Sequence, residues 1–308
     1  MRLLVVTARY PTPDRPAAGA FVRDRVRDPE LRVRIVAPHR YDGSRLGRFA
    51  RLGWEALSTR GRFEGVEAHF VLPTGPVALL AARLRGLPLV VYAHGGDVRD
   101  GAHRSPLHRW LARRVLRGAA AVVTNSAETA DLVLELGGVA EVVPPGIDLA
   151  RFSPSPRPSP RRVLYLGGDV VHKGVGVARG LADTMLGPGL GEVDPAHIPA
   201  LIAEHDVLLV PSQAEPFGVV AAEAIASGRW VVASAVGGLT EIVTDGVNGT
   251  LVSDGNFAAA LAAVPDYDPA AVAATAERFG LARHWAGMAA IWRRVRAERS
   301  PTAPERPS

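Results

Sequence analysis

The stretch EPFGVVAAEAIASG, residues 215–228, sets two glutamates eight positions apart around a Pro-Phe-Gly turn and the start of an alanine-rich helix. It follows DVLLVPS (206–212), a short apolar run that predicts a buried strand of a parallel sheet. Ligands of open α/β sheets bind beyond the carboxyl ends of the strands. The sequence therefore predicts a ligand site at this turn.

The start of the helix predicts an anion site within that turn. We expect the helix to open at Pro216 or Phe217, which leaves the amides near Gly218, Val219 and Val220 without intrahelical acceptors. Such helix N-termini bind phosphates, because the amides and the helix dipole both favour negative charge.

The two glutamates predict contacts to hydroxyl groups of the same ligand. Glu215 precedes the first turn, and Glu223 lies one to two turns into the helix. The alternative interpretation makes Glu215 an exposed loop residue that stabilises the helix dipole and places Glu223 on a solvated face. The surroundings of Glu223, VVAAEAIA, argue against it, because an ionised carboxylate is rarely set among apolar residues without a partner.

Outward from this stretch, apolar runs alternate with helical patterns along the chain. This order predicts an α/β fold with two alternating halves. Buried strands are expected at 3–8, 33–38, 88–97, 119–124, 162–168, 206–212 and 230–238, and helices at 19–28, 126–136, 173–183, 270–280 and 281–297. Ser126 or Asn125 is the expected N-cap of the second helix.

A proline- and serine-rich stretch, residues 143–162, divides the two halves and predicts a linker or hinge. We expect a first domain over 1–155, a more compact second domain over 161–280 and a disordered tail over 298–308. With 308 residues, 47% of them hydrophobic, the chain is long enough for two cores.

Composition excludes several classes of protein. The sequence has no cysteine, so disulfides and thiolate metal sites are excluded. No apolar run approaches the 18 or so residues of a spanning helix, and the start of the chain lacks the pattern of a signal peptide, so we expect a cytoplasmic protein. A net charge of +5 without a recognition motif does not indicate nucleic-acid binding.

One lysine, Lys173, stands among 36 basic residues, and arginine supplies all the others. Against this arginine bias a retained lysine indicates a role that arginine fills poorly, such as a compact point charge on a phosphate.

These residues together resemble a known family. The run 215–228, with WVVASAVGGLTEIVTDGVNGTLV after it, is similar to the E-x7-E donor-site signature of retaining GT-B glycosyltransferases of family 4. Further segments match in the same order, and the resemblance covers nearly the whole chain: RYPTP and GAFVRDRV near the start, HGGDV (94–98), TNSAET (124–129), PPGIDLARFSP (144–154) and YLGGDVVHKG (165–174).

The resemblance implies two Rossmann-like doubly wound domains facing a central cleft, with the helix at about 281–297 packing back on the first domain. It also implies roles for second-domain residues. Lys173 would neutralise the donor diphosphate, Glu223 would bind the nucleotide ribose, and Glu215 would bind the hydroxyls of the transferred sugar. Gly218 and Val219 would offer backbone amides, with Phe217 and Gly168 in the adjoining turns of the donor site.

In the first domain the resemblance implies three more site residues. Gly19 would allow the backbone to approach the diphosphate closely, as a side chain would obstruct it. His94 and Asp97, at the end of the strand PLVVYAH, would contact the sugar and help to define the acceptor pocket.

The implied reaction transfers a sugar from a nucleotide-diphosphate sugar to a hydroxyl acceptor with retention, and without a metal or a cofactor. The acceptor would be a natural product, a glycolipid or a polysaccharide precursor, either a small molecule or lipid-linked. A departing phosphate oxygen would itself accept the acceptor's proton, so no general base is named. Catalytic roles fall to His94, Glu215 and Lys173.

Two features depart from the family pattern. Family members usually carry an arginine where this chain has Gly168, and Arg9, Arg15 or Arg23 would have to compensate. The segment between Lys173 and the strand at 206–212 is also compressed. A degenerate family member that binds a nucleotide or partner without transfer, and a sugar-nucleotide epimerase on the same fold, are therefore the alternatives.

Two arginine-rich stretches, 45–62 and 103–118, interleave arginine with tryptophan and leucine, as in basic amphipathic helices at anionic surfaces. The alternative for each is an ordinary helix with a solvated arginine face. Weak peripheral membrane contact is expected from the first stretch. The DYD motif at 266–268 predicts a helix start with Asp268 as N-cap, not a metal site.

Overall fold

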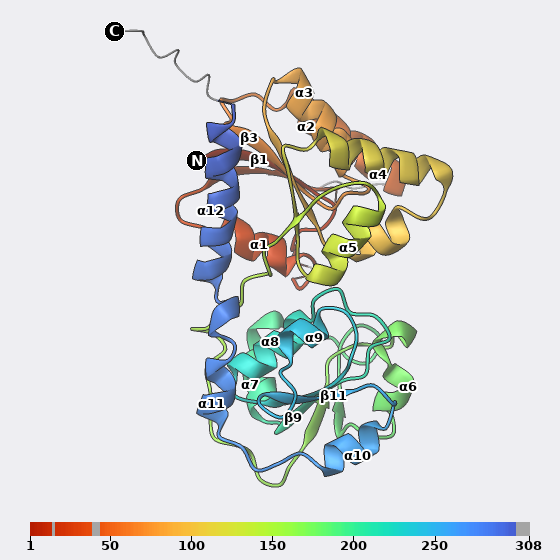
Figure 1. Ribbon diagram of the computed structural model, residues 1–308, viewed down its shortest axis with the longest axis vertical. Coiled ribbons are helices and arrows are strands. Elements are labelled where there is room, and N and C mark those ends of the chain that lie inside the picture. The colour runs from red at the N-terminus through yellow and green to blue at the C-terminus, as the bar shows by residue number, and fades with distance from the viewer. Residues whose placement is uncertain (14–15, 39–43, 300–308) are drawn as a thin grey trace.

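The computed structural model describes residues 1–13, 16–38 and 44–299. It confirms the predicted fold class, because two all-parallel sheets, each covered by helices, form two α/β domains (Figure 1). The predicted tail beyond residue 299 and Arg15 lie outside the described residues.

The first sheet has six strands in the order β2-β1-β3-β4-β5-β6. The strands are β1 (Arg2–Thr7), β2 (Arg32–Val36), β3 (Gly65–His69), β4 (Leu89–Ala93), β5 (Ala121–Thr124) and β6 (Glu141–Val142). The helices are α1 (Ala20–Val26), α2 (Arg45–Ser58), α3 (Gly75–Leu84), η2 (Asp97–Gly101), α4 (Pro106–Gly118) and α5 (Ala127–Glu135). The N-cap expected at Ser126 is confirmed, since its hydroxyl accepts from Thr129 N.

The second sheet has five strands in the order β11-β10-β9-β7-β8. The strands are β7 (Val163–Tyr165), β8 (Thr184–Met185), β9 (Val207–Val210), β10 (Trp230–Ser234) and β11 (Gly249–Val252). The helices are η3 (Val171–Lys173), α6 (Val175–Ala178), η4 (Pro195–His197), α7 (Ile198–Ala203), α8 (Val219–Ala226), α9 (Leu239–Ile242), α10 (Phe257–Ala262), α11 (Pro269–Ala274) and η5 (Glu277–Phe279). The expected compression is visible in β8, a strand of two residues.

Some elements differ from the sequence-based expectation, and others confirm or extend it. Strand β3 and helix α3 were not predicted, although β3 lies between β1 and β4 at the centre of the first sheet. Helix α2 runs for 14 residues despite its glycines, with the Ser44 hydroxyl accepting from Gly47 N at its start. Asp268 is confirmed as the N-cap of α11, where its side chain accepts from Ala270 N.

The last helix, α12 (Leu281–Ala297), returns to the first domain and lies along its sheet beside α1 (Figure 1). It buries Met288, Ile291, Trp292 and Val295 in one core cluster with strands β1 and β4. The Trp292 ring lies over Gly65, where an added Cβ would come within 2.3 Å of it. The chain thus crosses between the domains twice.

The two crossing segments are joined by backbone hydrogen bonds. Ile147 N donates to Phe279 O at 2.7 Å, and Leu281 N donates to Ile147 O at 3.0 Å. The linker is also anchored to the second domain by the buried Arg229, whose guanidinium donates to the carbonyls of Ser155 and Pro156. The linker path is therefore fixed at both ends by protein contacts.

Candidate functional site

A cavity of about 480 Å³ lies between the two domains, at the carboxyl ends of their strands. Residues of both domains line it, among them Arg9, Phe21 and Asn125 of the first and Tyr165 and Ser212 of the second. Of the residues predicted for the site, those that line the cavity are His94, Lys173, Glu215, Phe217, Gly218 and Val219.

The N-terminus of α8 faces this cavity with free amides. Gly218 is the N-cap, with a left-handed φ of +105° that a residue with a side chain rarely adopts. An added Cβ there would also lie 2.8 Å from the Leu239 side chain. The amides of Gly218, Val219 and Val220 have no hydrogen-bond acceptor among the described residues. They are the donors that an anion would use.

Lys173 and Glu215 lie beside these amides and bind each other. The Lys173 Nζ is 2.6 Å from Glu215 Oε2, and the Ser212 hydroxyl donates to the same oxygen at 3.3 Å. The turn that carries Lys173 is fixed to the end of strand β7, because the Tyr165 hydroxyl donates to Gly168 O and Lys173 O. Lys173, Glu215 and the amides of residues 218–220 are called the α8 site below.

A pair of glycines that the sequence did not single out supports the Glu215 turn. Gly238 N donates to Glu215 O at 2.9 Å. An added Cβ at Gly237 would lie 2.2 Å from Glu215 O, and one at Gly238 would lie 2.5 Å from Phe217 Cα. The signal in the sequence was the Gly-Gly at the end of the strand 230–238, which we interpreted only as a strand end.

On the other side of the cavity, His94 follows the last residue of β4. Its ring is packed by the rings of Phe21, Phe70 and Tyr92, with centroids 4.4, 4.7 and 4.6 Å away. Burial, and then the neighbouring His69, His284 and Arg9, hold the pKa of His94 well below its usual value. His94 is therefore a neutral imidazole.

Asp97 and Gly19 do not line the cavity. The Asp97 carboxylate is buried and accepts from two backbone amides, His94 N at 2.9 Å and Val71 N at 2.6 Å. Burial raises its pKa to about 6. At Gly19 an added Cβ would lie 2.6 Å from the Arg9 carbonyl oxygen. Both residues shape the loops that surround His94 and Arg9.

Gly168 and Glu223 also lie outside the cavity lining. Gly168 has a φ of +70°, and an added Cβ would lie 2.7 Å from the Pro188 carbonyl oxygen. The compressed loop 186–191 thus occupies the space beside position 168, so an arginine could not be placed there without moving that loop. The Glu223 carboxyl has no partner among the described residues, and burial, outweighing the Arg151 charge, raises its pKa to about 8.

The three arginines considered as substitutes for the missing one at position 168 differ in placement. Arg9 lines the cavity. The Arg23 guanidinium binds its neighbour Asp24 at 2.9 Å. Arg15 lies outside the described residues. Arg9 is thus the described arginine best placed to meet a diphosphate in the cavity.

The domains touch at one edge of the cavity. Helix α5 begins opposite α9 (Figure 1), and Ala127 N donates to Glu241 Oε1 of α9 at 2.8 Å. Gly95 lies against Pro216, where an added Cβ would come within 2.4 Å of the proline Cβ. The two loops that carry His94 and Glu215 are therefore in direct contact.

The sequence did not point to two buried polar residues of β3, Glu67 and His69, that lie directly behind His94. The His69 Nδ1 is 3.1 Å from His94 Nε2, and Glu67 Oε1 is 3.2 Å from His69 Nε2.

Two facing Rossmann-like domains with an anion site at a helix N-terminus in the cleft define a GT-B glycosyltransferase fold. Solved structures agree with this class. Anabaena HepE in complex with UDP aligns with a TM-score of 0.70 over 94% of this chain and 99% of that one, at 20% identity. Sucrose-phosphate synthase from Thermosynechococcus elongatus aligns with a TM-score of 0.72, at 19% identity, over 97% and 100% of the two chains.

Sequence relatives give the family. Residues 2–151 match the model "Glycosyltransferase Family 4", and residues 189–266 match "Glycosyl transferases group 1". D-inositol 3-phosphate glycosyltransferases are 34% identical in Geodermatophilus obscurus, over 68% of this chain, and 31% identical in Kribbella flavida, over 77% of it. The chain spans 61% and 73% of the lengths of these two relatives. The chain belongs to glycosyltransferase family 4.

Proposed function

We propose that this protein transfers a glycosyl group from a nucleoside diphosphate sugar to a hydroxyl acceptor, with retention at the anomeric carbon. The observation that carries the proposal is the α8 site, which gathers one ammonium and three free amides around a carboxylate in a single cavity. Such a set binds a diphosphate through the cation and the amides, and sugar hydroxyls through the carboxylate.

The comparisons support the donor class. The HepE structures are described as complexes with UDP and with UDP-glucose, and the sequence relatives are named as glycosyltransferases. By analogy we propose a nucleoside diphosphate sugar donor for this chain. D-inositol 3-phosphate is the first acceptor to assay, because several relatives carry it in their names.

The proposed step needs no protein base. The bond between the anomeric carbon and the departing phosphate oxygen breaks while a bond to the acceptor oxygen forms on the same face of the sugar. The acceptor's proton passes to the departing phosphate oxygen. The protein's part is to stabilise the charge that develops on the diphosphate, through Lys173 and the amides of residues 218–220, and to place the acceptor.

The glutamates and His94 complete the proposed roles. A diphosphate would compete with Glu215 for Lys173, and the displaced carboxylate would accept hydrogen bonds from sugar hydroxyls. Glu223 would ionise when ribose hydroxyls donate to it, since hydrogen bonds to the charged form lower a pKa. His94 would bind a hydroxyl on the opposite side of the cavity. Gly19, Asp97 and Gly168 would keep the surrounding turns in place.

We also propose that the first domain contacts an anionic membrane surface through α2, α3 and α4. These helices pack side by side (Figure 1). Each exposes two large apolar side chains, between 36% and 74% exposed: Trp54, Leu57, Leu80, Leu84, Leu107 and Trp110. The same helices expose arginines 51, 83, 109, 113, 114 and 117, and their one acidic residue, Glu55, binds Arg34.

Exposed apolar side chains interspersed with arginines are typical of helices that bind at anionic lipid surfaces. Among the described residues, no helix combines the length and apolar content that crossing a bilayer requires. This face would bring the enzyme to a lipid-linked acceptor. The cytoplasmic location and the acceptor both stay predictions.

The membrane contact is tested by sedimentation with vesicles of zwitterionic lipid, with and without anionic lipid. We expect binding only to the anionic vesicles, and a loss of at least about tenfold in the Trp54→Ser, Trp110→Ser double variant. The control is Val247→Ser, which changes an exposed apolar residue of the second domain. Equal binding of all three proteins would refute the proposal.

The transferase proposal is tested by calorimetry with UDP, GDP, ADP and dTDP, and then by donor hydrolysis and transfer with the sugar conjugates of the nucleotide that binds. Binding of one nucleotide with measurable transfer supports the proposal. Binding without hydrolysis or transfer favours the degenerate binder that the glycine at position 168 suggested. Conversion of the donor sugar into its epimer would favour the epimerase.

A further inference from the structure

We propose that Glu67 and His69 are positioning residues for His94: they hold its ring and fix its proton on Nε2, which leaves Nδ1 as a hydrogen-bond acceptor for a substrate hydroxyl. This inference rests on the proposed function only for the identity of the substrate, because the arrangement of the three residues is a property of the folded first domain. Glu67, His69 and His94 are called the histidine row below.

The sheet itself aligns the histidine row. Glu67 and His69 are alternate residues of β3, so their side chains extend from the same face, and His94 follows the neighbouring strand β4. Glu67 Oε1 lies 3.2 Å from His69 Nε2, and His69 Nδ1 lies 3.1 Å from His94 Nε2. The rings of His69 and His94 are nearly parallel, with an interplanar angle of 17°.

The buried end of the row is a carboxylate that can only accept. Arg25 Nε and Nη2 donate to Glu67 at 3.2 and 3.1 Å, and Trp292 Nε1 donates at 2.8 Å. Burial alone would raise the pKa of Glu67, but the Arg25 charge and the hydrogen bonds from His69 and Trp292 hold that pKa well below its usual value. Glu67 is therefore ionised.

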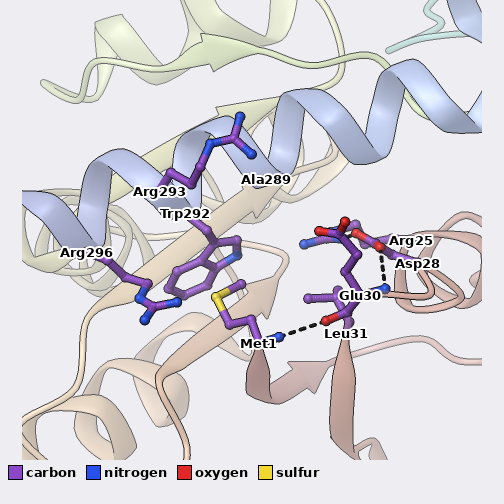
Figure 2. A pocket seen from close by; sticks show the side chains of 9 residues that line it. All are labelled: Met1, Arg25, Asp28, Glu30, Leu31, Ala289, Trp292, Arg293 and Arg296. Atoms are coloured by element: carbon purple, nitrogen blue, oxygen red, sulfur yellow. Dashed lines mark hydrogen bonds and ion pairs between the residues drawn. The ribbon is translucent and has the colours of Figure 1, made fainter.

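Figure 2 shows where these two donors come from. Arg25 of α1, next to Asp28, and Trp292 of α12 lie at opposite sides of a pocket of about 340 Å³. The Arg25 Nη1 also lies 3.3 Å from Asp28 Oδ2, so Arg25 joins two carboxylates. The first helix and the last helix of the described chain thus meet at the carboxylate that begins the row.

The hydrogen-bond directions follow from Glu67. An ionised carboxylate has no proton to donate, so His69 Nε2 is the donor in their bond. We infer that His69 carries this one proton, so that its Nδ1 accepts and His94 Nε2 donates to it. The His94 proton is therefore on Nε2, and its Nδ1 has a free lone pair with no donor among the described residues.

The packing around His94 keeps its ring in this orientation. Phe21, Phe70 and Tyr92 surround it. Phe70 has a φ of +81°, the single residue other than glycine with a positive φ among the described residues. Its strained backbone is held by hydrogen bonds, since Phe70 N donates to Tyr92 O and the Thr74 hydroxyl donates to His69 O. Strain of this kind is common next to ligand sites.

The test measures the His94 tautomer directly, by nitrogen-15 NMR of histidine-labelled protein with His94→Gln as the assignment control. We expect the proton on Nε2 in the wild type and a mixture of tautomers in His69→Leu, which offers no acceptor. His69→Asn should keep the wild-type tautomer, because its side-chain oxygen can lie near the former Nδ1. A wild-type proton on Nδ1 would overturn the proposal.

The kinetic arm separates positioning from folding. We expect transfer or donor hydrolysis to fall about tenfold in His69→Leu and about twofold in His69→Asn, with the nucleotide Kd unchanged in both. The proposal would also be overturned if the wild type and His69→Leu showed the same distribution of His94 tautomers and the same reaction rates. If His69→Leu does not fold, the wild-type and His69→Asn spectra still decide. Absence of transfer with every donor would refute the proposed function while the NMR result stands.

Discussion

The two sides of the cavity are built in different ways. The α8 site consists of groups on turns, and its ion pair is partly exposed, with 30% of the Lys173 side chain and 12% of the Glu215 side chain accessible. The histidine row begins deep in the first domain, where Glu67 is fully buried and each of its bonds goes to another protein group.

This difference separates two ways of preparing a site. In the α8 site the amides of residues 218–220 have no acceptors among the described residues, so a bound ligand would determine how the charged groups of the site are paired. The histidine row is paired during folding, so the ligand meets one fixed acceptor. Substitutions in the row should therefore affect folding first, and substitutions in the α8 site should affect binding first.

The largest expected effect is on stability, from Glu67→Gln. This change keeps the size of the side chain but leaves the buried Arg25 with Asp28 as its one carboxylate partner among the described residues. We expect a loss of about 3 kcal/mol in the free energy of unfolding, because one member of a buried ion pair is removed. Urea unfolding followed by the tryptophan fluorescence of the first domain measures it.

The matched control for that experiment is Glu30→Gln, an exposed glutamate near the same pocket. We expect a change within about 0.5 kcal/mol. A Glu67→Gln protein as stable as this control would show that the row does not depend on an ionised carboxylate, and the contrast with the α8 site would disappear.

The next effect is on binding, from Lys173→Met. Loss of the ammonium should weaken nucleoside diphosphate binding by about 2 kcal/mol, roughly thirtyfold, because a charge-assisted contact is lost. The free energy of unfolding should change little, since the side chain is partly exposed. Calorimetry and thermal unfolding check the two halves. Unchanged affinity would mean that Arg9 and the amides carry the diphosphate without Lys173.

An effect of similar size concerns the pH dependence of stability. The pKa of Glu223, about 8, lies above its ordinary value of 4.5, so the folded state binds the proton more tightly than the unfolded state. The stabilisation is complete below the ordinary value and is lost as the pH rises through the folded pKa. Between about pH 5 and about pH 9 the full shift would correspond to about 4 kcal/mol. Because the Glu223 side chain is partly exposed, solvent screening reduces the effect. Relative to Glu223→Gln, the wild type should therefore lose about 2 kcal/mol over this range.

Parallel curves for the two proteins would mean that Glu223 has an ordinary pKa. The same residue offers a second measurement. If ribose hydroxyls bind Glu223, nucleotide binding near neutral pH should release a proton, detected by calorimetry in buffers of different ionisation enthalpy. The release should disappear in Glu223→Gln.

The smallest expected effect is a gain, from Glu215→Gln. Removal of the carboxylate frees Lys173 from its ion pair, so a nucleoside diphosphate should bind up to about threefold more tightly. Transfer should nevertheless fall, because the hydroxyl acceptor for the sugar is weaker. Calorimetry with the nucleotide alone and with its sugar conjugate separates the two. Weaker nucleotide binding would place Glu215 on the phosphates instead.

The same contrast explains what could be predicted from the sequence. The residues of the Glu215 turn lie within one short stretch of sequence, so they could be recognised together. Lys173 could be singled out because it is the one lysine of the sequence, and all its other long basic residues are arginines. The alternating apolar runs predicted the two parallel sheets. Strand β3 was missed, although Val-Glu-Ala-His alternates apolar and polar residues, and this pattern would have indicated a half-buried strand and not the fully buried one observed.

Two partners of Glu67, Arg25 and Trp292, could not be found in any local window. Arg25 is 42 positions away, and Trp292 is 225 positions away. A buried glutamate is rare without such partners, so β3 becomes interpretable as a central strand only when all three residues are placed together. For the same reason, the sequence did not show why position 168 lacks an arginine. The loop 186–191 that occupies the space beside Gly168 belongs to a later part of the chain.

The return of α12 to the first sheet has a consequence for synthesis on the ribosome. The residues of the second sheet emerge before α12, whereas the core cluster of β1 and β4 needs Met288, Ile291, Trp292 and Val295. Domains generally fold as the chain emerges, with N-terminal units first. Here the final step departs from this order, because the domain that is translated first can complete its core only after the last helix has been synthesised. Until then, the apolar face that α12 later covers must be protected from aggregation.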